Sequence, residues 1–231
     1  MAVTVCWSVK GGSGTTVVAC ALALAAARDG DVVLVDLAGD APAVLGVAEP
    51  PVAGIHGWLA GASSSLGGCA TRAADRLLLV PAGARAAATG PGPAPHRPAA
   101  VADARWEALV AAASALAPTV VVDAGTGAPP EALVESADHA LLVLRPCYLA
   151  LRRASVQDRR PTGVVLVAEP GRALGRRDVE GVVGARVRSE VPVDPSIARC
   201  VDAGLLATRL PRALADALAP GPRRAPGDAP A

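Results

Sequence analysis

The feature that most constrains this chain is an apolar stretch that runs into a glycine-rich turn and then into an alanine-rich stretch. Residues 3–9 (VTVCWSV) predict a strand, residues 10–16 (KGGSGTT) a turn and residues 15–28 a helix. Glycines let a backbone fold around a phosphate, and the N-terminus of a helix adds partial positive charge. The stretch therefore predicts a phosphate-binding loop; an ordinary tight turn between strand and helix is the alternative.

The rest of the chain alternates short Val/Leu runs with longer Ala-rich stretches, which is typical of a mostly parallel sheet with helices on both faces. We predict a single α/β domain over residues 1–219, with a twisted sheet. Strands are expected at 3–9, 31–36, 76–81, 119–123, 140–146, 163–168 and 185–191. Helices are expected at 15–28, 103–116, 130–137, 147–157, 178–184, 196–203 and 210–219.

Two segments do not fit this alternation. Residues 81–100 are rich in Pro, Gly and Ala and predict a flexible loop between a strand and a helix. Residues 220–231 have no apolar periodicity, so we expect a disordered tail. Neither segment is expected to form part of the packed core.

Composition narrows the class of protein. The 231 residues are 52% hydrophobic but contain no Phe, so the core must be aliphatic. Five cysteines without a C-x-x-C pair favour reduced thiols in a cytoplasm over disulfides or a zinc site. No apolar run reaches the roughly 18 residues of a membrane span, so no integral membrane segment is expected.

Charge is uneven along the chain. The whole sequence carries a net charge of +1, whereas the residues after Ala150 hold 14 Arg against 9 acidic residues. Such a surplus permits contact with nonspecific DNA or an anionic membrane. A solvated Arg-rich surface is the favoured interpretation, because aromatic residues do not interleave the arginines and the pI is about 7.7.

Two predicted strands end in an aspartate, at Asp36 and Asp123. Ligands of open α/β sheets bind at the carboxyl ends of the strands, so both carboxylates are expected beside the phosphate-binding loop. Thr16 stands at the Ser/Thr position of that loop, where a hydroxyl coordinates Mg²⁺. We therefore expect Thr16 and Asp123 to hold a Mg²⁺ ion.

The loop VKGGSGTT resembles the deviant phosphate-binding loop of the ParA/MinD family, in which an additional lysine stands where this chain has Lys10, its only lysine. Residues 33–46, 119–146 and 190–204 are similar to later motifs of that family. The resemblance implies a P-loop NTPase fold that binds ATP or ADP with Mg²⁺. It also implies a homodimer in which Lys10 reaches the phosphates of the partner, and a nucleotide site that comprises Lys10, Gly11, Gly12, Ser13, Gly14, Thr15, Thr16, Pro192 and Asp194.

The chain departs from this family at two important positions. Thr15 replaces the usual loop lysine, and Ala38 replaces the second aspartate of an Asp-x-Asp motif that begins at Asp36. Asp40 stands two residues later and could replace that second aspartate only if the loop after Asp36 folds differently from the family's. A unit charge about 4 Å from a phosphate is worth roughly 4 kcal/mol near a protein surface. We therefore expect weak or absent ATP hydrolysis, and no catalytic residue is assigned beyond Lys10, Asp36 and Asp40 as candidates.

This degenerate pattern is most similar to the short actinobacterial CpaE/TadZ-like branch of the family. The resemblance implies a dimeric localisation or scaffolding factor for Flp/Tad pilus assembly or secretion, cytoplasmic and recruited to a pole, a septum or a membrane complex. Two alternatives stay open. One is an active partitioning or septum-site-positioning ATPase that binds nonspecific DNA or membrane, and the other is a nucleotide-free dimeric binding module.

Overall fold

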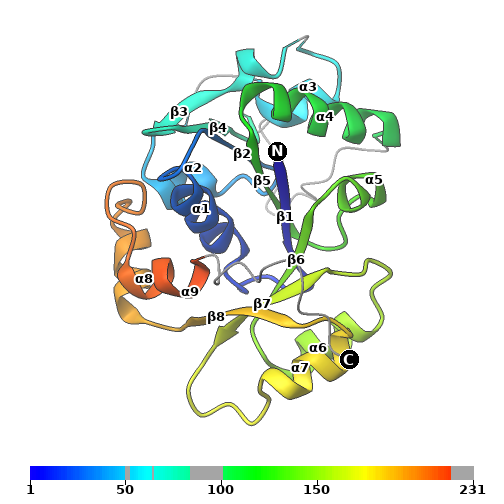
Figure 1. The fold of residues 1–231 in the computed structure, drawn as a ribbon, viewed down its shortest axis with the longest axis vertical. Helices are drawn as coiled ribbons and strands as arrows, with labels where there is room; N and C mark the ends of the chain where they lie inside the picture. The colour runs from blue at the N-terminus through cyan, green and yellow to red at the C-terminus, as the bar shows by residue number, and fades with distance from the viewer. Residues whose placement is uncertain (50–52, 64, 84–100, 220–231) are drawn as a thin grey trace, which may run out of the picture.

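The structure, a computed structural model, describes residues 1–49, 53–63, 65–83 and 101–219. These residues form one eight-stranded sheet in the order β3-β4-β2-β5-β1-β6-β7-β8, with helices on both sides (Figure 1). All neighbouring strands pair in parallel except β3 and β4, which are antiparallel. The strands are β1 (Ala2–Ser8), β2 (Val32–Asp36), β3 (Thr71–Ala74), β4 (Leu77–Val80), β5 (Thr119–Thr126), β6 (His139–Leu144), β7 (Gly163–Ala168) and β8 (Val187–Pro192).

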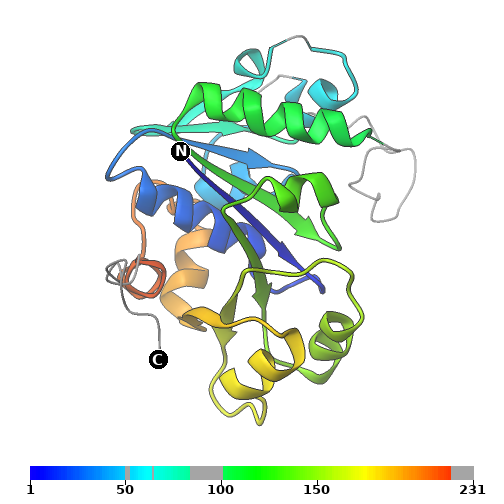
Figure 2. The same cartoon turned by 45° about the vertical axis from the view of Figure 1, so that its right-hand side comes forward.

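The helices divide between the two faces of the sheet (Figure 2). One face packs on α1 (Thr15–Ala26), α2 (Ala41–Leu45), α8 (Pro195–Asp202) and α9 (Arg212–Leu218). The other packs on α3 (Gly54–Leu59), α4 (Asp103–Leu116), α5 (Glu131–Glu135), α6 (Tyr148–Ser155) and α7 (Arg176–Val183). A 3-10 helix, η1 (Gly67–Cys69), precedes β3. The single α/β domain with a mostly parallel sheet is therefore confirmed.

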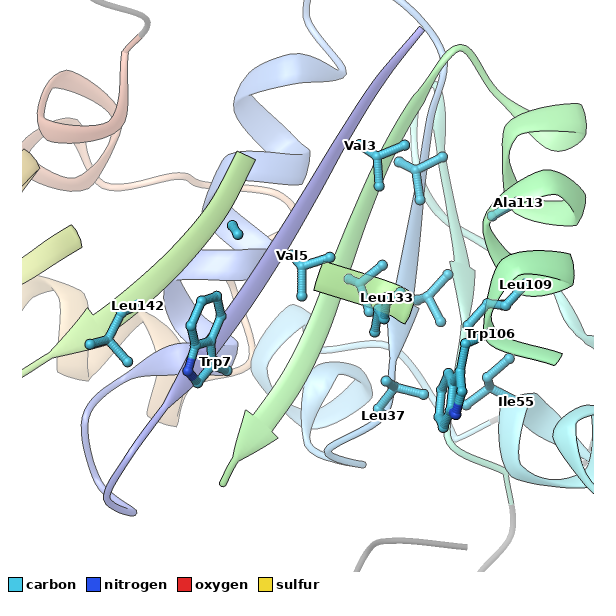
Figure 3. Packing of buried hydrophobic residues seen from close by; sticks show 14 of the residues in the cluster. Val3, Val5, Trp7, Leu37, Ile55, Trp106, Leu109, Ala113, Leu133 and Leu142 are labelled. Carbon is cyan, nitrogen blue, oxygen red and sulfur yellow. The ribbon is translucent and has the colours of Figure 1, made fainter. Parts of the chain in front are cut away.

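The two apolar clusters explain why the strands contain almost no polar residues. Strands of a parallel sheet are covered on both faces, so consecutive side chains enter different clusters. In β1, Val5 and Trp7 belong to the cluster that also contains residues of α4 and α5, whereas Cys6 belongs to the cluster that contains residues of α1. Figure 3 shows Trp106 and Leu109 of α4 pointing toward the strands. An aliphatic core was the expectation, and Trp7, Trp58 and Trp106 are its aromatic exceptions among the described residues.

Each predicted strand and helix has a counterpart, but four short elements were not predicted. The helices α2 and α3 have five and six residues, and η1 has three, so none shows a helical period in the sequence. The strand β3 is the antiparallel edge. The predicted end of the fourth strand at Asp123 is wrong, because β5 continues to Thr126.

The predicted loop at 81–100 and the tail at 220–231 fall almost wholly outside the described residues, and only 81–83 can be placed. Among the helices that the structure describes, none combines the length and the hydrophobicity that crossing a bilayer requires.

Candidate functional site

A cavity of about 1220 Å³ opens at the carboxyl edge of the sheet. Its walls come from the loops after β1, β2 and β5, together with single side chains from α3 and α4 and the end of α8. This is the edge at which open α/β sheets bind their ligands. The lining includes Gly11, Gly12, Ser13, Gly14, Thr15, Thr16, Leu37, Ala38, Asp40, Val44, His56, Trp106, Gly125, Thr126, Gly127, Pro130, Asp202 and Gly204.

The loop after β1 has the geometry of a phosphate cradle. Gly12 and Gly14 adopt positive φ angles of 76° and 84°, a region that side chains rarely enter. The Ser13 hydroxyl donates to the carbonyl oxygen of Lys10 at 2.7 Å and so closes the loop. Gly14 is the N-cap of α1, whose first backbone N–H groups have no partner within the helix. An anion is the group that such a helix N-terminus favours.

Asp123 is fully buried at this edge, and only one of its two carboxylate oxygens accepts a hydrogen bond from the described residues. Its Oδ1 accepts a hydrogen bond from the Gly125 N–H at 3.0 Å, while Oδ2 has no hydrogen-bond partner among the described residues. Burial raises the pKa of Asp123 to about 7; the Thr16 hydroxyl lowers it in part, and the nearby charges of Asp36 and Asp40 add to the increase. A buried, unpartnered carboxylate oxygen beside a threonine hydroxyl suits a hard cation.

Magnesium would need further ligands from elsewhere. No group of three or more His, Cys, Asp or Glu side chains in the described ranges is placed to hold a metal ion. Mg²⁺ usually takes one or two protein oxygens and completes its shell with water and substrate phosphate. Thr16 and Asp123 therefore fit a Mg²⁺–nucleotide complex better than a metal bound by the protein alone.

Asp36, which ends β2, accepts hydrogen bonds from the protein backbone on both carboxylate oxygens. Its Oδ1 accepts from the N–H groups of Ala38 at 2.9 Å and Gly39 at 2.7 Å, and its Oδ2 accepts from Ala41 at 3.0 Å. Burial raises its pKa, and these three backbone bonds oppose the increase. Asp36 thus holds the loop between β2 and α2 through both of its oxygens and is fully buried.

The loop between β2 and α2 also contributes Ala38 and Asp40 to the cavity wall. Ala38 lines the cavity and packs closely on the β5 end, since a Cβ added to Gly125 would lie 3.1 Å from the Ala38 Cβ. Asp40 is exposed, stands at the N-cap of α2 and also lines the cavity. A methyl group therefore stands at position 38, where the resemblance led us to look for a second aspartate, and Asp40 is the carboxylate of this loop that lines the cavity.

No Lys or Arg side chain of the described residues lines the cavity. The charged residues of its lining are Asp40 and Asp202. The Lys10 side chain also lies outside the lining, with its Nζ 3.3 Å from the carbonyl oxygen of Gly11. The site therefore combines an anion-binding backbone with acidic side chains.

Two residues that the resemblance placed in the nucleotide site, Pro192 and Asp194, lie outside the cavity lining. The Asp194 carboxylate instead accepts from the Ser196 N–H at 2.6 Å and caps α8. Hydrogen bonding by Ser196 lowers the pKa of this carboxyl group. The opposite end of α8 reaches the cavity at Asp202 and Gly204.

Sequence reasoning missed that end of α8, and it also missed His56 and Trp106 on the far wall. The sequence did contain one indication of a close contact there, because Gly204 is a glycine that follows the end of a helix. A Cβ on Gly46 would collide with the carbonyl oxygen of Gly204, so two glycines are needed where α2 meets the end of α8. The histidine and the tryptophan had no such signal.

Comparison with known proteins gives one kind of match. No protein-family model matches the sequence, and no curated protein matches it. Among solved structures, the MinD cell division protein of Aquifex aeolicus aligns over 94% of both chains, with a TM-score of 0.70 at 20% identity. The septum site-determining protein MinD of Pyrococcus horikoshii OT3, complexed with Mg-ADP, aligns over 94% of this chain and 92% of its own, with a TM-score of 0.71 at 20% identity.

A ParA family ATPase from Chlorobium tepidum TLS aligns over 93% of this chain and 96% of its own, with a TM-score of 0.69 at 18% identity. These identities are low, so what they establish is the architecture. The alignments extend over almost the whole of each chain, and the shared fold is the one expected from the loop at residues 10–16 and the strand order around it. The chain therefore has the fold of the MinD and ParA ATPases.

Proposed function

We propose that this chain is a ParA/MinD-type protein with a degenerate ATPase site, which binds ATP or ADP with Mg²⁺ and uses the bound nucleotide to assemble as a dimer. The fold supports the proposal, as does the Mg-ADP complex of the similar P. horikoshii MinD. The cavity supports it too, because the glycine loop and the N-terminus of α1 form part of its wall.

The observation that carries the proposal is the mismatch between backbone and side chains in the cavity. The phosphate loop and the unpartnered oxygen of Asp123 are retained, but no described Lys or Arg lines the cavity. One cation about 4 Å from a phosphate contributes roughly 4 kcal/mol, which is about a thousandfold in affinity. A single chain should therefore bind nucleotide weakly, and a cation from elsewhere should strengthen binding.

The residues then have separate roles. The N–H groups of the glycine loop and of the first turn of α1 hold the phosphates, and Thr16 and Asp123 hold Mg²⁺, which neutralises phosphate charge when bound. Asp36 keeps the loop of residues 37–41 in place. Ala38 offers no oxygen to orient an attacking water, so hydrolysis is slow. Lys10, whose side chain does not line the cavity of its own chain, supplies a cation to the phosphates of the second copy.

The cellular role follows from this site. A protein that binds nucleotide without efficient hydrolysis acts as an assembly switch, because turnover does not drive repeated cycles. We propose a dimeric localisation or scaffolding factor for Flp/Tad pilus assembly or secretion, of the CpaE/TadZ-like kind. It is a cytoplasmic protein recruited to a pole, septum or membrane complex by proteins of that machinery.

A calorimetric titration of ATP and of ADP, each with Mg²⁺, tests the proposal on the wild type and on Thr15→Lys. Thr15 lines the cavity at the start of α1, so a lysine there restores the missing charge. We expect at least tenfold tighter binding. Thr15→Met is the matched control, with a similar length and no charge, and it should leave the affinity near that of the wild type.

Hydrolysis separates this proposal from an active partitioning or septum-site-positioning ATPase. We expect the wild type to release no phosphate above background, with or without DNA or anionic vesicles. Steady hydrolysis that Lys10→Ala abolishes would contradict the degenerate site. ATP-dependent, salt-sensitive binding to nonspecific DNA would then favour the partitioning role.

A nucleotide-free dimeric binding module is the second candidate, and the acidic lining of the cavity favours it. The negative charges of Asp40 and Asp202 repel nucleotide phosphates. A module that binds no nucleotide would also not require the Lys10 side chain in the cavity, and that side chain does not line it. Sedimentation that is equal with and without Mg-ATP, together with no thermal stabilisation by nucleotide, would select this candidate.

A further inference from the structure

A pocket of about 440 Å³ lies at the amino edge of the sheet, opposite the phosphate loop. The end of α1, the turn between β3 and β4 and the segment between α8 and α9 form its walls; Figure 1 shows them in blue, cyan and orange. This amino-edge pocket shares no lining residue with the larger cavity. The twelve residues of α1, about 18 Å of helix, lie between the two, so the amino-edge pocket is a separate hollow.

The amino-edge pocket joins an aliphatic interior to a charged rim. Its exposed lining residues include Arg28, Asp75 and Arg76, and none of the three forms an ion pair with a residue that the structure describes. Two arginines against one aspartate leave a net positive charge on the rim. The buried or partly buried lining is Leu24, Ala27, Ala74, Ala207 and Leu210. The pocket therefore offers an apolar surface and two unpaired cations to another molecule.

Arg76 has a backbone conformation that an arginine rarely adopts. Asp75 and Arg76 form the two-residue turn from β3 to β4, and the φ of Arg76 is 54°. Apart from glycines, no other described residue has a positive φ. Tight hairpin turns favour glycine at such a position, because a Cβ is strained there. The arginine therefore costs the turn stability, and strained residues of this kind cluster at functional sites.

The turn itself is held by the neighbouring strand. The Arg76 carbonyl oxygen accepts from the Val32 N–H, at the start of β2, at 2.9 Å. This bond uses only backbone atoms, so a glycine at position 76 would keep it. The arginine side chain is therefore not required for the turn, and its contribution is a second positive charge on the pocket rim beside that of Arg28.

The lining of the amino-edge pocket selects among ligands. Its aliphatic interior suits a branched apolar side chain, and arginines bind carboxylates through two parallel hydrogen bonds. None of the described lining residues is an aromatic on which a nucleic-acid base could stack, and Asp75 repels a phosphate backbone. Apolar residues at the bottom of a hollow do not reach into a bilayer. Residues 220–231 contain two Arg and one Asp, so the chain's own tail lacks the complementary charge.

We propose that the amino-edge pocket binds an acidic peptide segment of a partner protein. An aliphatic side chain of that segment packs against Leu24 and Leu210, and its flanking carboxylates pair with Arg28 and Arg76. Asp75 adds specificity, because it disfavours ligands that carry many phosphates. A volume of about 440 Å³ is within the range of pockets that bind small ligands. This interaction goes beyond the proposed nucleotide switch and does not require it.

NMR spectra of the isotope-labelled full chain, recorded without nucleotide, test this binding. The probe is the peptide acetyl-Glu-Glu-Leu-Glu-Glu-amide, and its matched control replaces each Glu with Gln. We expect the acidic peptide to shift the amide signals of residues 24–28, 74–77 and 207–210 and to leave those of the phosphate loop at 10–16 unchanged. The neutral peptide should shift none of them. Shifts that are absent from the three pocket segments, or equal for both peptides, would overturn the proposal.

Arg76→Gly gives the sharper result, because it should raise stability while it lowers affinity. Relief of the positive φ should raise the melting temperature by about 2 °C. Loss of the guanidinium group should raise the dissociation constant of the acidic peptide about fivefold, and Arg28→Ala should do the same. Arg72→Ala is the matched control, because Arg72 is exposed on β3 in the same hairpin and does not line the pocket. It should bind the peptide like the wild type.

Three further results would overturn the binding of an acidic peptide. One is an Arg76→Gly protein that binds the peptide like the wild type. Another is an Arg76→Gly protein that melts at a lower temperature, since the arginine would then serve its own turn. The third is inorganic phosphate that displaces the peptide at equal concentration, which would indicate a site for small anions. Because no nucleotide is present, failure of the nucleotide switch would leave these results unchanged, and the two proposals are tested separately.

Discussion

Two aspartates of this protein arise from the same sequence pattern and have different roles in the structure. Asp36 and Asp123 each follow a run of buried valines, face each other on neighbouring strands β2 and β5, and have no exposed surface. Asp36 accepts three backbone hydrogen bonds from the loop that follows it. Asp123 accepts one, and its second oxygen has no hydrogen-bond partner in the described structure.

The difference is made by the residues that follow. After Asp36 the chain ends its strand and turns back through Gly39, whose φ is 95°, so that N–H groups converge on the carboxylate. After Asp123 the strand continues to Thr126, so the N–H groups of the following residues do not converge on its carboxylate, which accepts only the one from Gly125. An aspartate that follows a buried run is thus structural where the strand ends and the loop folds over it, and one oxygen stays unpaired where the strand continues.

Asp36→Ala is the strongest test of this contrast. It removes the acceptor of three backbone bonds, one of them to the fully buried Ala41 N–H. Hydrogen bonds to charged groups contribute about 1.5–3 kcal/mol each, and the burial cost of the carboxylate offsets part of the sum. We expect a loss of about 4 kcal/mol in the free energy of unfolding, measured by urea denaturation without ligand.

Asp123→Ala is the matched control for that experiment. Because Asp123 has one backbone bond and a pKa raised by burial, its removal should cost less than 1 kcal/mol at pH 7. Equal losses in the two variants would show that the carboxylates have the same role, contrary to the hydrogen bonds observed.

The pH dependence of stability should also separate the pair. The pKa of Asp123 is about 7 when folded, against roughly 3.9 when unfolded. Between pH 4 and pH 7 the folded protein therefore holds more protons than the unfolded one, so stability is full below pH 4 and falls as the pH rises through 7. The loss is on the order of 4 kcal/mol, since the two pKa values differ by roughly 3 units and each unit corresponds to about 1.4 kcal/mol.

Asp123→Asn should remove most of that loss, giving a urea midpoint above the wild type at pH 8 and equal to it at pH 4. A smaller slope of the same sign should remain, because burial also raises the pKa of Asp36. A wild type whose stability rises between pH 5 and pH 8 would contradict the raised pKa.

The sequence was sufficient for the parts of this site that depend on local chemistry. Gly12 and Gly14, which take positive φ angles, and the buried strand with Asp123 were predicted from residue types and spacing alone. The roles that depend on contacts between distant parts of the chain were not predicted. That Asp36 is satisfied by its own loop, and that Asp202 lines the cavity while Asp194 caps α8, follow from how α2 and α8 pack together.

Gly125→Ala tests the contact between the two loops. Gly125 has a φ of 67°, and an added Cβ would lie 3.1 Å from the Ala38 Cβ, so the substitution strains the backbone and presses the loops apart. We expect a loss of about 2 kcal/mol and weaker nucleotide binding.

Gly11→Ala is the control, because a Cβ there meets nothing within 4 Å and the backbone φ is not positive. Its stability should stay within about 0.5 kcal/mol of the wild type. If Gly125→Ala were equally mild, the two loops would not be packed as tightly as the 3.1 Å approach implies.

Ser8→Ala should have the smallest effect and shows how the open loop is held. Ser8 also holds the residues that follow Asp123. Its hydroxyl donates to the Lys10 carbonyl at 3.1 Å and lies 3.4 Å from the Gly125 carbonyl and 3.3 Å from the Thr126 hydroxyl, and its own carbonyl accepts from the Gly127 N–H at 2.8 Å. The alanine keeps that backbone bond, so we expect a loss of about 1 kcal/mol in urea denaturation. Hydrogen exchange should rise at residues 125–128 and stay unchanged at 37–41, because only the first of these loops depends on a side chain from β1. Faster exchange in both loops would mean that they open as one unit. The difference between Asp36 and Asp123 would then concern only their own hydrogen bonds and would not extend to the stability of the two loops.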